Sequence, residues 1–250
     1  QAAMGVSNCI LTNRVSYLFD LQGPCEPIDT ACSSSLVAVH RAVEAIRGGS
    51  CEAAIVGGVH TMLSPLAFMA YDMSGMLSED GRCKTFDESA DGYVRGEGVG
   101  ALLLKPLSQA QADGDTIRAV IRGSAVSHGG KSNSMTAPRT ASQARLICDA
   151  VSASGVAPSS ISYLEAHGTG TKLGDPVEIN ALKKAFERLY AEEGADFSMP
   201  QRCWIGAVKT ACGHLETAAG IAGLFKVIKA MEHDQLPANL NFSKQNPYVD

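Results

Sequence analysis

Apolar residues gather along the chain in short runs, each bounded by Gly, Pro or Asp. Such a run is typical of a central strand that other elements cover on both faces. Three runs predict strands of this kind, at Glu52–Val59, Gly98–Leu107 and Thr116–Val126. Two further strands are predicted later in the chain, at Ile161–His167 and Cys203–Lys209.

Helical segments separate these strands. In the first of them the apolar residues Leu36, Val39, Val43 and Ile46 recur three and four positions apart, and two glycines end the pattern. Strands that alternate with helices predict an α/β fold. The predicted helices are Leu36–Ile46, Ser142–Ala153, Asp175–Tyr190 and Thr217–Met231.

Two of these helices have informative first turns. Asp175 fits an N-cap, Pro176 fits the first helical position, and Glu178 fits the capping-box position. The helix at Thr217–Met231 begins with Ala and Gly residues, so its first turns can pack close to other backbone.

The composition excludes several classes of protein. The chain has 250 residues, of which 45% are hydrophobic and 19% charged, which is ordinary for a globular protein with a sizeable core. The net charge of −5, without a basic stripe, argues against a nucleic-acid surface. No apolar run is long enough to span a bilayer. The polar segment Ser108–Asp115 separates two halves of the chain.

Eight cysteines are present, but their spacing shows no CxxC pair and no zinc or disulfide pattern. Most of them are interpreted as reduced core thiols of a cytosolic protein. Cys32 differs, because a predicted helix follows it at once in "DTACSSSLVAVH". A helix N-terminus lowers thiol pKa values to roughly 3.5–7.5, so Cys32 is either a reactive thiol or a small residue at a tight turn.

Two histidines are candidate partners of this thiol. His167 ends a predicted strand in "EAHGTGTKLGDPVE", before a Gly-rich loop in which Thr169 and Thr171 offer hydroxyls. His214 lies in "VKTACGHLETAAG", again between a strand and a helix, with Lys209 five residues before it.

The remaining histidines are weaker candidates. His40 and His233 are interpreted as structural or solvated, His60 is ambiguous, and His128 belongs to a polar loop that could line a cleft. A metal site of one Cys and two His is conceivable, but these residues lack the local pairing that is common in zinc sites.

The stretches "DTACSSSLVAVHRA", "EAHGTGTKLGDPVE" and "VKTACGHLETAAGIAG" resemble, in order and spacing, the three catalytic motifs of β-ketoacyl synthases. The whole chain resembles the ketosynthase domains of modular type I polyketide synthases. The phrases "CILTNRVSYLFDLQGP" and "GGKSNSMTAP" are most similar to those of assembly lines with separately encoded acyltransferases.

The resemblance implies a thiolase-like fold of two similar α/β halves, in an α/β/α/β/α arrangement that is incomplete at both ends. Residues 1–110 would form the N-terminal half with the nucleophile, and residues 116–250 the C-terminal half with both histidines. The family further implies a homodimer in the cytoplasm. It also implies a reaction without a metal or cofactor, whose substrates are carried on the phosphopantetheine of an acyl carrier protein.

The resemblance also implies a role for each site residue. Cys32 would accept the acyl chain, and His167 and His214 would donate hydrogen bonds to the thioester oxygen of a malonyl-type unit as it loses carbon dioxide. Lys209 would support the histidines electrostatically. Thr169 and Thr171 would bind the pantetheine arm. The reaction is a decarboxylative Claisen condensation in polyketide or related fatty acid biosynthesis.

Several alternatives and departures qualify this interpretation. A non-elongating, acyl-transferring relative or a non-catalytic dimer partner usually lacks Cys32 or His167, and both are present. A cysteine hydrolase would leave the second histidine and Lys209 unexplained. Ala211 and Cys212 depart from the subclass pattern. Because the family's domain is longer at both ends, the 250 residues alone are expected to fold poorly or to be inactive.

Overall fold

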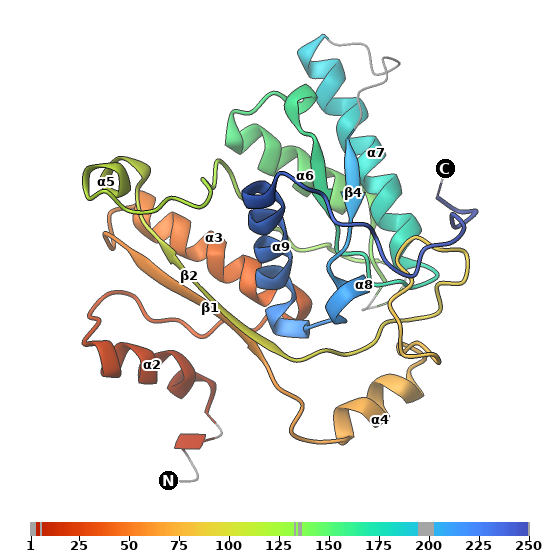
Figure 1. Ribbon diagram of the computed structural model, residues 1–250, viewed down its shortest axis with the longest axis horizontal. Helices are drawn as coiled ribbons and strands as arrows, with labels where there is room; N and C mark the ends of the chain where they lie inside the picture. Colours follow the sequence, from red (N-terminus) through yellow and green to blue (C-terminus); the bar gives the residue numbers. More distant parts are fainter. Residues whose placement is uncertain (1–3, 6, 133, 135–136, 195–202, 250) are drawn as a thin grey trace.

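The computed structural model describes residues 4–5, 7–132, 134, 137–194 and 203–249 (Figure 1). Helices and strands alternate through most of these residues, which confirms the predicted α/β class. The elements of the first half are α2 (Asn8–Phe19), η1 (Ala31–Ser33), α3 (Ser34–Arg47), β1 (Ala54–His60), α4 (Leu66–Met73), β2 (Gly98–Leu104) and α5 (Leu107–Ala112). Those of the second half are α6 (Thr140–Ser154), η2 (Pro158–Ser160), β3 (Tyr163–Glu165), α7 (Gly174–Glu193), β4 (Trp204–Gly206), α8 (Lys209–Cys212), η3 (Glu216–Ala218) and α9 (Ala219–His233).

The first half is built on the antiparallel pair β1–β2, whose register runs from Ala54 opposite Leu104 to His60 opposite Gly98. Helix α3 covers one face of this pair. Val39 and Val43 of α3 and Val56 of β1 form a buried apolar cluster there. Burying such side chains is worth roughly 1.5–3 kcal/mol each, so this contact fixes where α3 begins relative to the strands.

The opposite face of the pair is exposed within the described residues. Val99 is 81% exposed and Leu103 71%, and Ile55, which lies opposite Leu103 in the register, is 48% exposed. Side chains of a strand alternate between its two faces, so these residues share the uncovered one. The prediction that both faces of these strands are covered is therefore wrong for this face.

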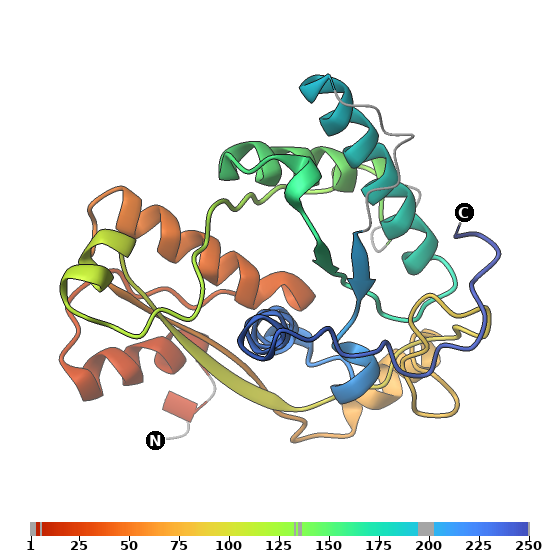
Figure 2. The same cartoon turned by 45° about the horizontal axis from the view of Figure 1, so that its top comes forward.

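The second half contains the parallel pair β3–β4, in which Tyr163 lies opposite Trp204 and Glu165 opposite Gly206. Helices α6 and α7 pack on each other through Cys148, Ala185 and Leu189 (Figure 2). Parallel strands need a crossover connection, and α7 supplies it between β3 and β4.

The strand predicted at Thr116–Val126 is absent; the structure gives this segment no regular secondary structure. Its contacts still tie it to the first half. Ile121 packs on the cluster of Val39, Val43 and Val56, and the Ser124 hydroxyl lies 2.9 Å from Nδ1 of His40. A strand requires a hydrogen-bonded neighbour as well as apolar residues, and none of the described segments pairs with this one.

Helix α9 lies between the two halves (Figures 1 and 2). Its first turn is close to the start of α3, as the Ala and Gly content of the segment predicts. A Cβ on Gly220 would collide with Leu36, and the backbone N–H of Ile221 donates to Oγ of Ser35 at 3.1 Å. This close approach brings the chain around residue 214 to the N-terminus of α3.

Other elements differ from the prediction in detail. Helices α2 and α4 were not predicted from the sequence. The segment predicted as the strand Cys203–Lys209 forms only three residues of β4 before α8 begins at Lys209. Helix α7 begins at Gly174 after Leu173, and Oγ1 of Thr171 accepts the Gly174 N–H at 3.1 Å. Asp175 is therefore not the N-cap.

Candidate active site

Cys32 lies in a tight turn directly before α3. Ala31 has a positive φ of 53°, which is unusual for a residue other than glycine. Side chains nearby hold the turn: Ala31 N–H donates to Oδ1 of Asp29 at 3.2 Å, and Thr30 N–H donates to Oγ of Ser34 at 2.9 Å. The turn presents a half-buried thiol at the N-terminus of a 14-residue helix, as predicted.

His214 lies against this thiol. Its Nε2 is 3.0 Å from Sγ of Cys32, although the two residues are 182 positions apart. The side chain is 1% exposed and contacts the ring of Tyr93 edge to face, with 5.0 Å between the ring centroids. The predicted pairing of Cys32 with a histidine is thus present in the structure.

The hydrogen bonds of His214 fix its tautomer. The backbone N–H of Glu216 points at Nδ1 at 3.0 Å, and a backbone N–H can only donate. Nδ1 of the neutral ring is therefore the acceptor, and Nε2 carries the hydrogen. His214 directs this N–H at Cys32 and cannot take a proton at Nε2, so the geometry makes it a hydrogen-bond donor and not a general base.

His167 is the second ring at the site. It contacts His214 edge to face, with 5.5 Å between the ring centroids. Ligand atoms of Cys32, His167 and His214 all lie within 4.8 Å of one another. Among the residues that the structure describes, neither ring nitrogen of His167 has a hydrogen-bond partner, and the residue is exposed. This ring is consequently open to a ligand that approaches the thiol.

The backbone of His167, in contrast, is tightly held. The carboxylate of Glu178 accepts the N–H groups of His167 at 2.6 Å and Gly168 at 2.8 Å. Nζ of Lys209, whose residue is 4% exposed, donates to the carbonyl of His167 at 2.6 Å. Lys209 thus supports the site through the backbone of His167 as well as through its charge.

Asp175 and Glu178 have different roles from those predicted. The carboxylate of Asp175 is fully buried and accepts the backbone N–H groups of Phe86 at 2.7 Å and Gly170 at 3.1 Å. Both acids bind loops that precede α7 or come from the first half, and neither caps the helix. Capping was predicted from local spacing, whereas tertiary donors 5 to 89 residues away occupy these oxygens.

Burial and Lys209 keep both histidines neutral. Desolvation, and then the charge of Lys209, lowers the pKa of His214 to about 2. The same two causes lower the pKa of His167 to about 3. Both rings are therefore neutral hydrogen-bond donors at physiological pH.

The predicted electrostatics of Cys32 is wrong in direction. Burial raises the pKa of its thiol, although the charge of Lys209 opposes the change. The sequence shows the helix N-terminus but not the burial, which outweighs it. Cys32 is therefore protonated at rest, and the N–H of His214, Lys209 and the helix dipole stabilise the thiolate when it forms.

The two threonines lie in the loop after His167. Thr169 is 9% exposed, and its hydroxyl is 3.1 Å from that of Thr171. The loop therefore places the two hydroxyls beside each other, two and four residues after His167, and their part in binding pantetheine stays a prediction.

Comparison with protein families decides the identity of the fold. The N-terminal domain of β-ketoacyl synthases matches residues 1–110, and the C-terminal domain of the same family matches residues 118–243. The chain belongs to the β-ketoacyl synthase family.

Solved ketosynthases share its structure. An oxazolomycin ketosynthase domain from Streptomyces albus JA3453 superposes with a TM-score of 0.92 at 48% identity, covering 98% of this chain and 42% of that one. The ketosynthase from module 6 of the bacillaene synthase of Bacillus subtilis gives 0.93 at 46% identity, covering 98% and 43%. The fold of this ketosynthase chain is therefore thiolase-like, as the resemblance implied.

The similar curated proteins are polyketide synthases. The polyketide synthase PksN of Bacillus subtilis is 51% identical over 248 residues, which are 99% of this chain and 4% of that protein. The polyketide synthase ThaG of Burkholderia thailandensis is 49% identical over 248 residues, 99% of this chain and 4% of that protein. The chain spans a small part of the length of these relatives.

Sequence reasoning missed one group of residues in this ketosynthase. Glu216, Arg95 and His60 form an ionic cluster directly beside His214. His60 was left ambiguous, and Arg95 and Glu216 were not singled out. No local pattern could have found them, because their contacts join residues 35 to 156 positions apart.

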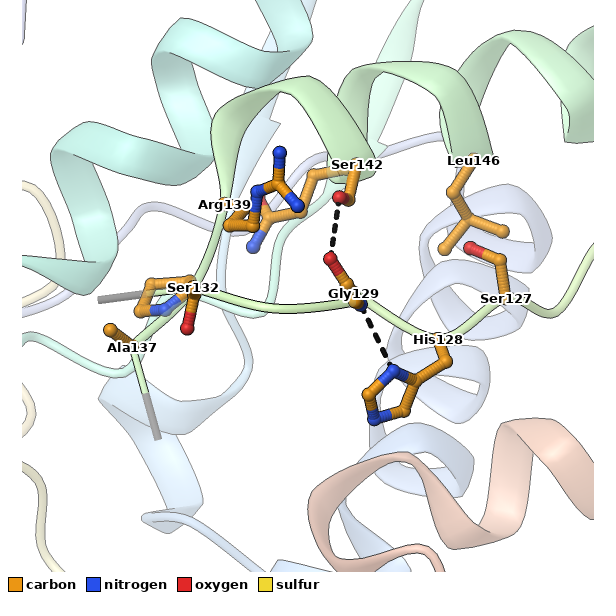
Figure 3. A pocket seen from close by; sticks show the side chains of 11 residues that line it. Ser127, His128, Gly129, Ser132, Ala137, Arg139, Ser142 and Leu146 are labelled. Carbon is orange, nitrogen blue, oxygen red and sulfur yellow. Dashed lines mark hydrogen bonds between the residues drawn. The ribbon is translucent and has the colours of Figure 1, made fainter. Parts of the chain in front are cut away.

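The other histidines of the ketosynthase lie away from the thiol. His40 contacts Ser124, and His233 ends α9. His128 lines a pocket of about 260 Å³ between its loop and the start of α6, with Arg139, Ser142 and Leu146 (Figure 3). The prediction that this loop lines a cleft is confirmed. Among the described helices, none is both long and apolar enough to cross a bilayer.

Proposed function

We propose that this chain carries the reaction centre of a β-ketoacyl synthase that performs decarboxylative Claisen condensation in polyketide biosynthesis. One observation carries the proposal: the Nε2–H of a neutral, buried His214 lies 3.0 Å from Sγ of Cys32, and the ring of His167 stands beside both. A thiol, two neutral donors and a buried cation match the needs of this reaction.

In the first half-reaction the thiolate of Cys32 attacks the thioester carbonyl of an acyl-pantetheine. A bond forms between Sγ and the carbonyl carbon, the bond to the pantetheine sulfur breaks, and the pantetheine sulfur takes up the proton that Cys32 gave up and leaves as a thiol. Lys209 and the helix N-terminus stabilise the thiolate before the attack. Covalent capture then divides one difficult step into two.

In the second half-reaction a malonyl thioester loses carbon dioxide, and the electrons of the broken bond form an enolate. The N–H groups of His167 and His214 donate to the enolate oxygen; one such donor is worth about 3–4 kcal/mol. The enolate carbon attacks the acyl group on Cys32, a carbon–carbon bond forms, and the thiolate leaves and takes up a proton. The products are a β-ketoacyl thioester, carbon dioxide and the free thiol.

The proposal includes the partners that the resemblance implies. The substrates are carried on the phosphopantetheine of an acyl carrier protein, and Thr169 and Thr171 bind the pantetheine arm. The ketosynthase works as a cytoplasmic homodimer. The share of solved ketosynthases that the chain covers supports the further proposal that the 250 residues do not turn over alone.

A site without a metal is part of the proposal. Zinc bound tetrahedrally by a thiolate at about 2.3 Å and an imidazole at about 2.0 Å would hold the two ligand atoms about 3.5 Å apart. Nε2 of His214 and Sγ of Cys32 are 3.0 Å apart, which suits a hydrogen bond. Elemental analysis of the purified full-length protein should find less than one equivalent of zinc per site. One equivalent of zinc per site would contradict the proposal that the site holds no metal.

Acylation of the full-length protein tests the function. Butanoyl-N-acetylcysteamine should label Cys32, found by peptide mass spectrometry, and malonyl-loaded carrier protein should then release carbon dioxide and a β-ketoacyl product. A Cys212→Ala variant controls for the exposed thiol two residues from His214. Label on Cys212 with Cys32 unmodified would contradict the assignment of Cys32 as the acylated residue. Label on Cys32 without condensation would favour a non-elongating, acyl-transferring ketosynthase.

A further inference from the structure

An ionic cluster of three side chains lies beside the active-site histidine pair. The carboxylate of Glu216 contacts Nε of Arg95 and, at 3.0 Å, Nε2 of His60. The side chains of the three residues are between 4% and 16% exposed. The guanidinium of Arg95 also lies over the rings of Phe68 and Tyr71, 4.5 and 5.1 Å from their centroids. We call Arg95, His60 and Glu216 the Glu216 cluster.

The hydrogen bonds of His60 determine its protons. Nδ1 is 2.8 Å from the carbonyl of Gly96, which can only accept, so Nδ1 carries a hydrogen. Nε2 lies 3.0 Å from the Glu216 carboxylate and 3.4 Å from Nη2 of Arg95. The carboxylate of Glu216 is thus held between the guanidinium of Arg95, from the segment that leads into β2, and the imidazole of His60, from β1.

Charges are costly to bury, so a cluster of this kind is weak evidence of a purely stabilising role. Nη1 of Arg95 is buried without a hydrogen-bond partner among the described residues, which adds to the cost. In other proteins, replacing a buried ionic cluster by hydrophobic residues of similar volume is often neutral or stabilising. Stability alone therefore does not account for the Glu216 cluster, and the next question is which part of the site it positions.

The backbone of Glu216 answers this question. Its N–H is the donor that fixes Nδ1 of His214, and its φ is +42°, in the left-handed region that glycine prefers. A side chain other than glycine stays in this conformation only when its surroundings impose it. The ion pairs to Arg95 and His60 hold the Glu216 side chain in place at this turn, beside the backbone hydrogen bond from Ala219 N–H to the Glu216 carbonyl.

The backbone beside Arg95 holds His214 as well. Gly96 N–H donates to the carbonyl of His214 at 2.9 Å, and His214 N–H donates to the carbonyl of Val94 at 2.7 Å. The backbone of residues 94–96 therefore binds the main chain of His214. The Arg95 side chain binds Glu216, the residue whose N–H orients the ring of His214.

We propose that Glu216 is a positioning residue: its carboxylate, clamped by Arg95 and His60, holds the left-handed turn whose backbone N–H sets the tautomer and direction of His214 against Cys32. The inference rests on the proposed donor role of His214. It assigns to the Glu216 cluster the control of catalytic geometry, without any contact to substrate.

Glu216→Ala and Glu216→Gly in the full-length protein test this assignment. Condensation is measured per active site, with sites counted by mass spectrometry of butanoylated Cys32. We expect kcat of Glu216→Ala to fall about 10- to 100-fold, while KM for the acyl thioester stays within about twofold. Glu216→Gly should keep about fivefold more activity than Glu216→Ala, because glycine adopts the left-handed turn freely.

Glu88→Ala is the matched control, because it removes a carboxylate from an ion pair with Lys244 that is 42% and 72% exposed. If Glu216 has a purely structural role, Glu216→Ala should lower the number of active sites that are butanoylated at Cys32 and leave kcat per site unchanged. That result, or a kcat of Glu216→Ala within twofold of the control, overturns the proposal, and Glu216→Gln repeats the test if Glu216→Ala does not fold.

Alkylation of Cys32 by iodoacetamide separates this inference from the proposed function. Burial raises the pKa of Cys32 and the Glu216 charge raises it further, so loss of the charge alone would make alkylation faster. Loss of the oriented Nε2–H should instead make alkylation of Cys32 slower in Glu216→Ala. Slower alkylation without condensation in the parent protein would retain the positioning role and reject the function; unchanged or faster alkylation would reject the positioning role.

Discussion

The two loops that carry His167 and His214 look alike in the sequence but hold their histidines by opposite means. In the loop after β3, Glu178 and Lys209 bind the backbone of His167, and its ring nitrogens are left for a ligand. In the loop after α8, the ring of His214 is bound at both nitrogens, by Glu216 N–H and by Cys32, and it is buried.

This difference assigns different tasks to two chemically identical side chains. His214 already contacts the thiol of Cys32, so its position affects the protonation of that thiol. His167 has a fixed backbone and an accessible ring, which suits a donor to an incoming second substrate. In the proposed reaction, the two histidines donate to the enolate from different loops, so a substitution in one loop can change the position of one donor without moving the other.

The largest expected effect comes from breaking the support of the His167 loop. Lys209→Met leaves the partly buried carboxylate of Glu178 and the carbonyl of His167 without their cation. Losing a hydrogen bond from a charged donor to a carbonyl costs about 1.5–3 kcal/mol. Hydrogen exchange with mass spectrometry on the full-length protein should show this loss of local stability at residues 163–178.

Lys229→Met is the control, because Lys229 pairs with Glu232 at 2.6 Å but is 67% exposed. Its loss should cost less than about 1 kcal/mol. Equal effects of the two substitutions would show that Lys209 does not hold the loop.

Local signals explain the part of this site that the sequence predicts. A helix after Cys32 and a Gly-rich loop after His167 follow from nearby residues, and α3 and the β3 segment bear them out. Whether Cys32 and His214 meet depends on residues 182 positions apart, so local residues could name His214 only as one of two candidate partners. Asp175 was misassigned because its oxygens bind Phe86 and Gly170 instead of its own helix.

A pH effect of intermediate size should come from the two neutral histidines. The folded pKa of His214, about 2, lies far below the unfolded value of 6.5, so the native state binds fewer protons than the unfolded state. Stability is then complete above pH 6.5 and falls by about 1.4 kcal/mol per pH unit as the pH drops below it. Hydrogen exchange at residues 203–218 between pH 7 and pH 5 measures this slope.

The folded pKa of His167, about 3, also lies far below 6.5, so each histidine contributes about 1.4 kcal/mol per pH unit. His214→Asn and His167→Asn should therefore each remove about half of the combined slope, and a slope that survives in the double variant would place the titrating group elsewhere.

The errors in the fold and in the electrostatics have a common physical origin. The residues at 116–126 favour a strand but find no ladder partner, and Val99 and Leu103 are apolar yet exposed. The helix N-terminus at Cys32 is visible in the sequence, whereas the burial that raises its pKa is not. Each error concerns a neighbour that local sequence does not specify.

The smallest expected effect concerns the threonines of the His167 loop. Thr169→Val removes the hydroxyl that is 3.1 Å from that of Thr171. If the pair binds pantetheine, KM for a butanoyl-carrier protein should rise about fivefold, as loss of one hydrogen bond implies.

Thr217→Val is the counterpart on the His214 side, where the hydroxyl donates to the carbonyl of Val59 at 2.6 Å. It should leave KM unchanged. A rise in KM of the same size in both variants would argue against a binding role for Thr169.

The rate at which iodoacetamide alkylates Cys32 in full-length His214→Asn and His167→Asn tests the unequal roles of the two histidines most directly. Because the ring of His214 donates to Sγ and that of His167 does not in the described residues, His214→Asn should slow alkylation about tenfold, and His167→Asn should change it by less than about twofold. Equal slowing in the two variants, or slowing only in His167→Asn, would contradict the account.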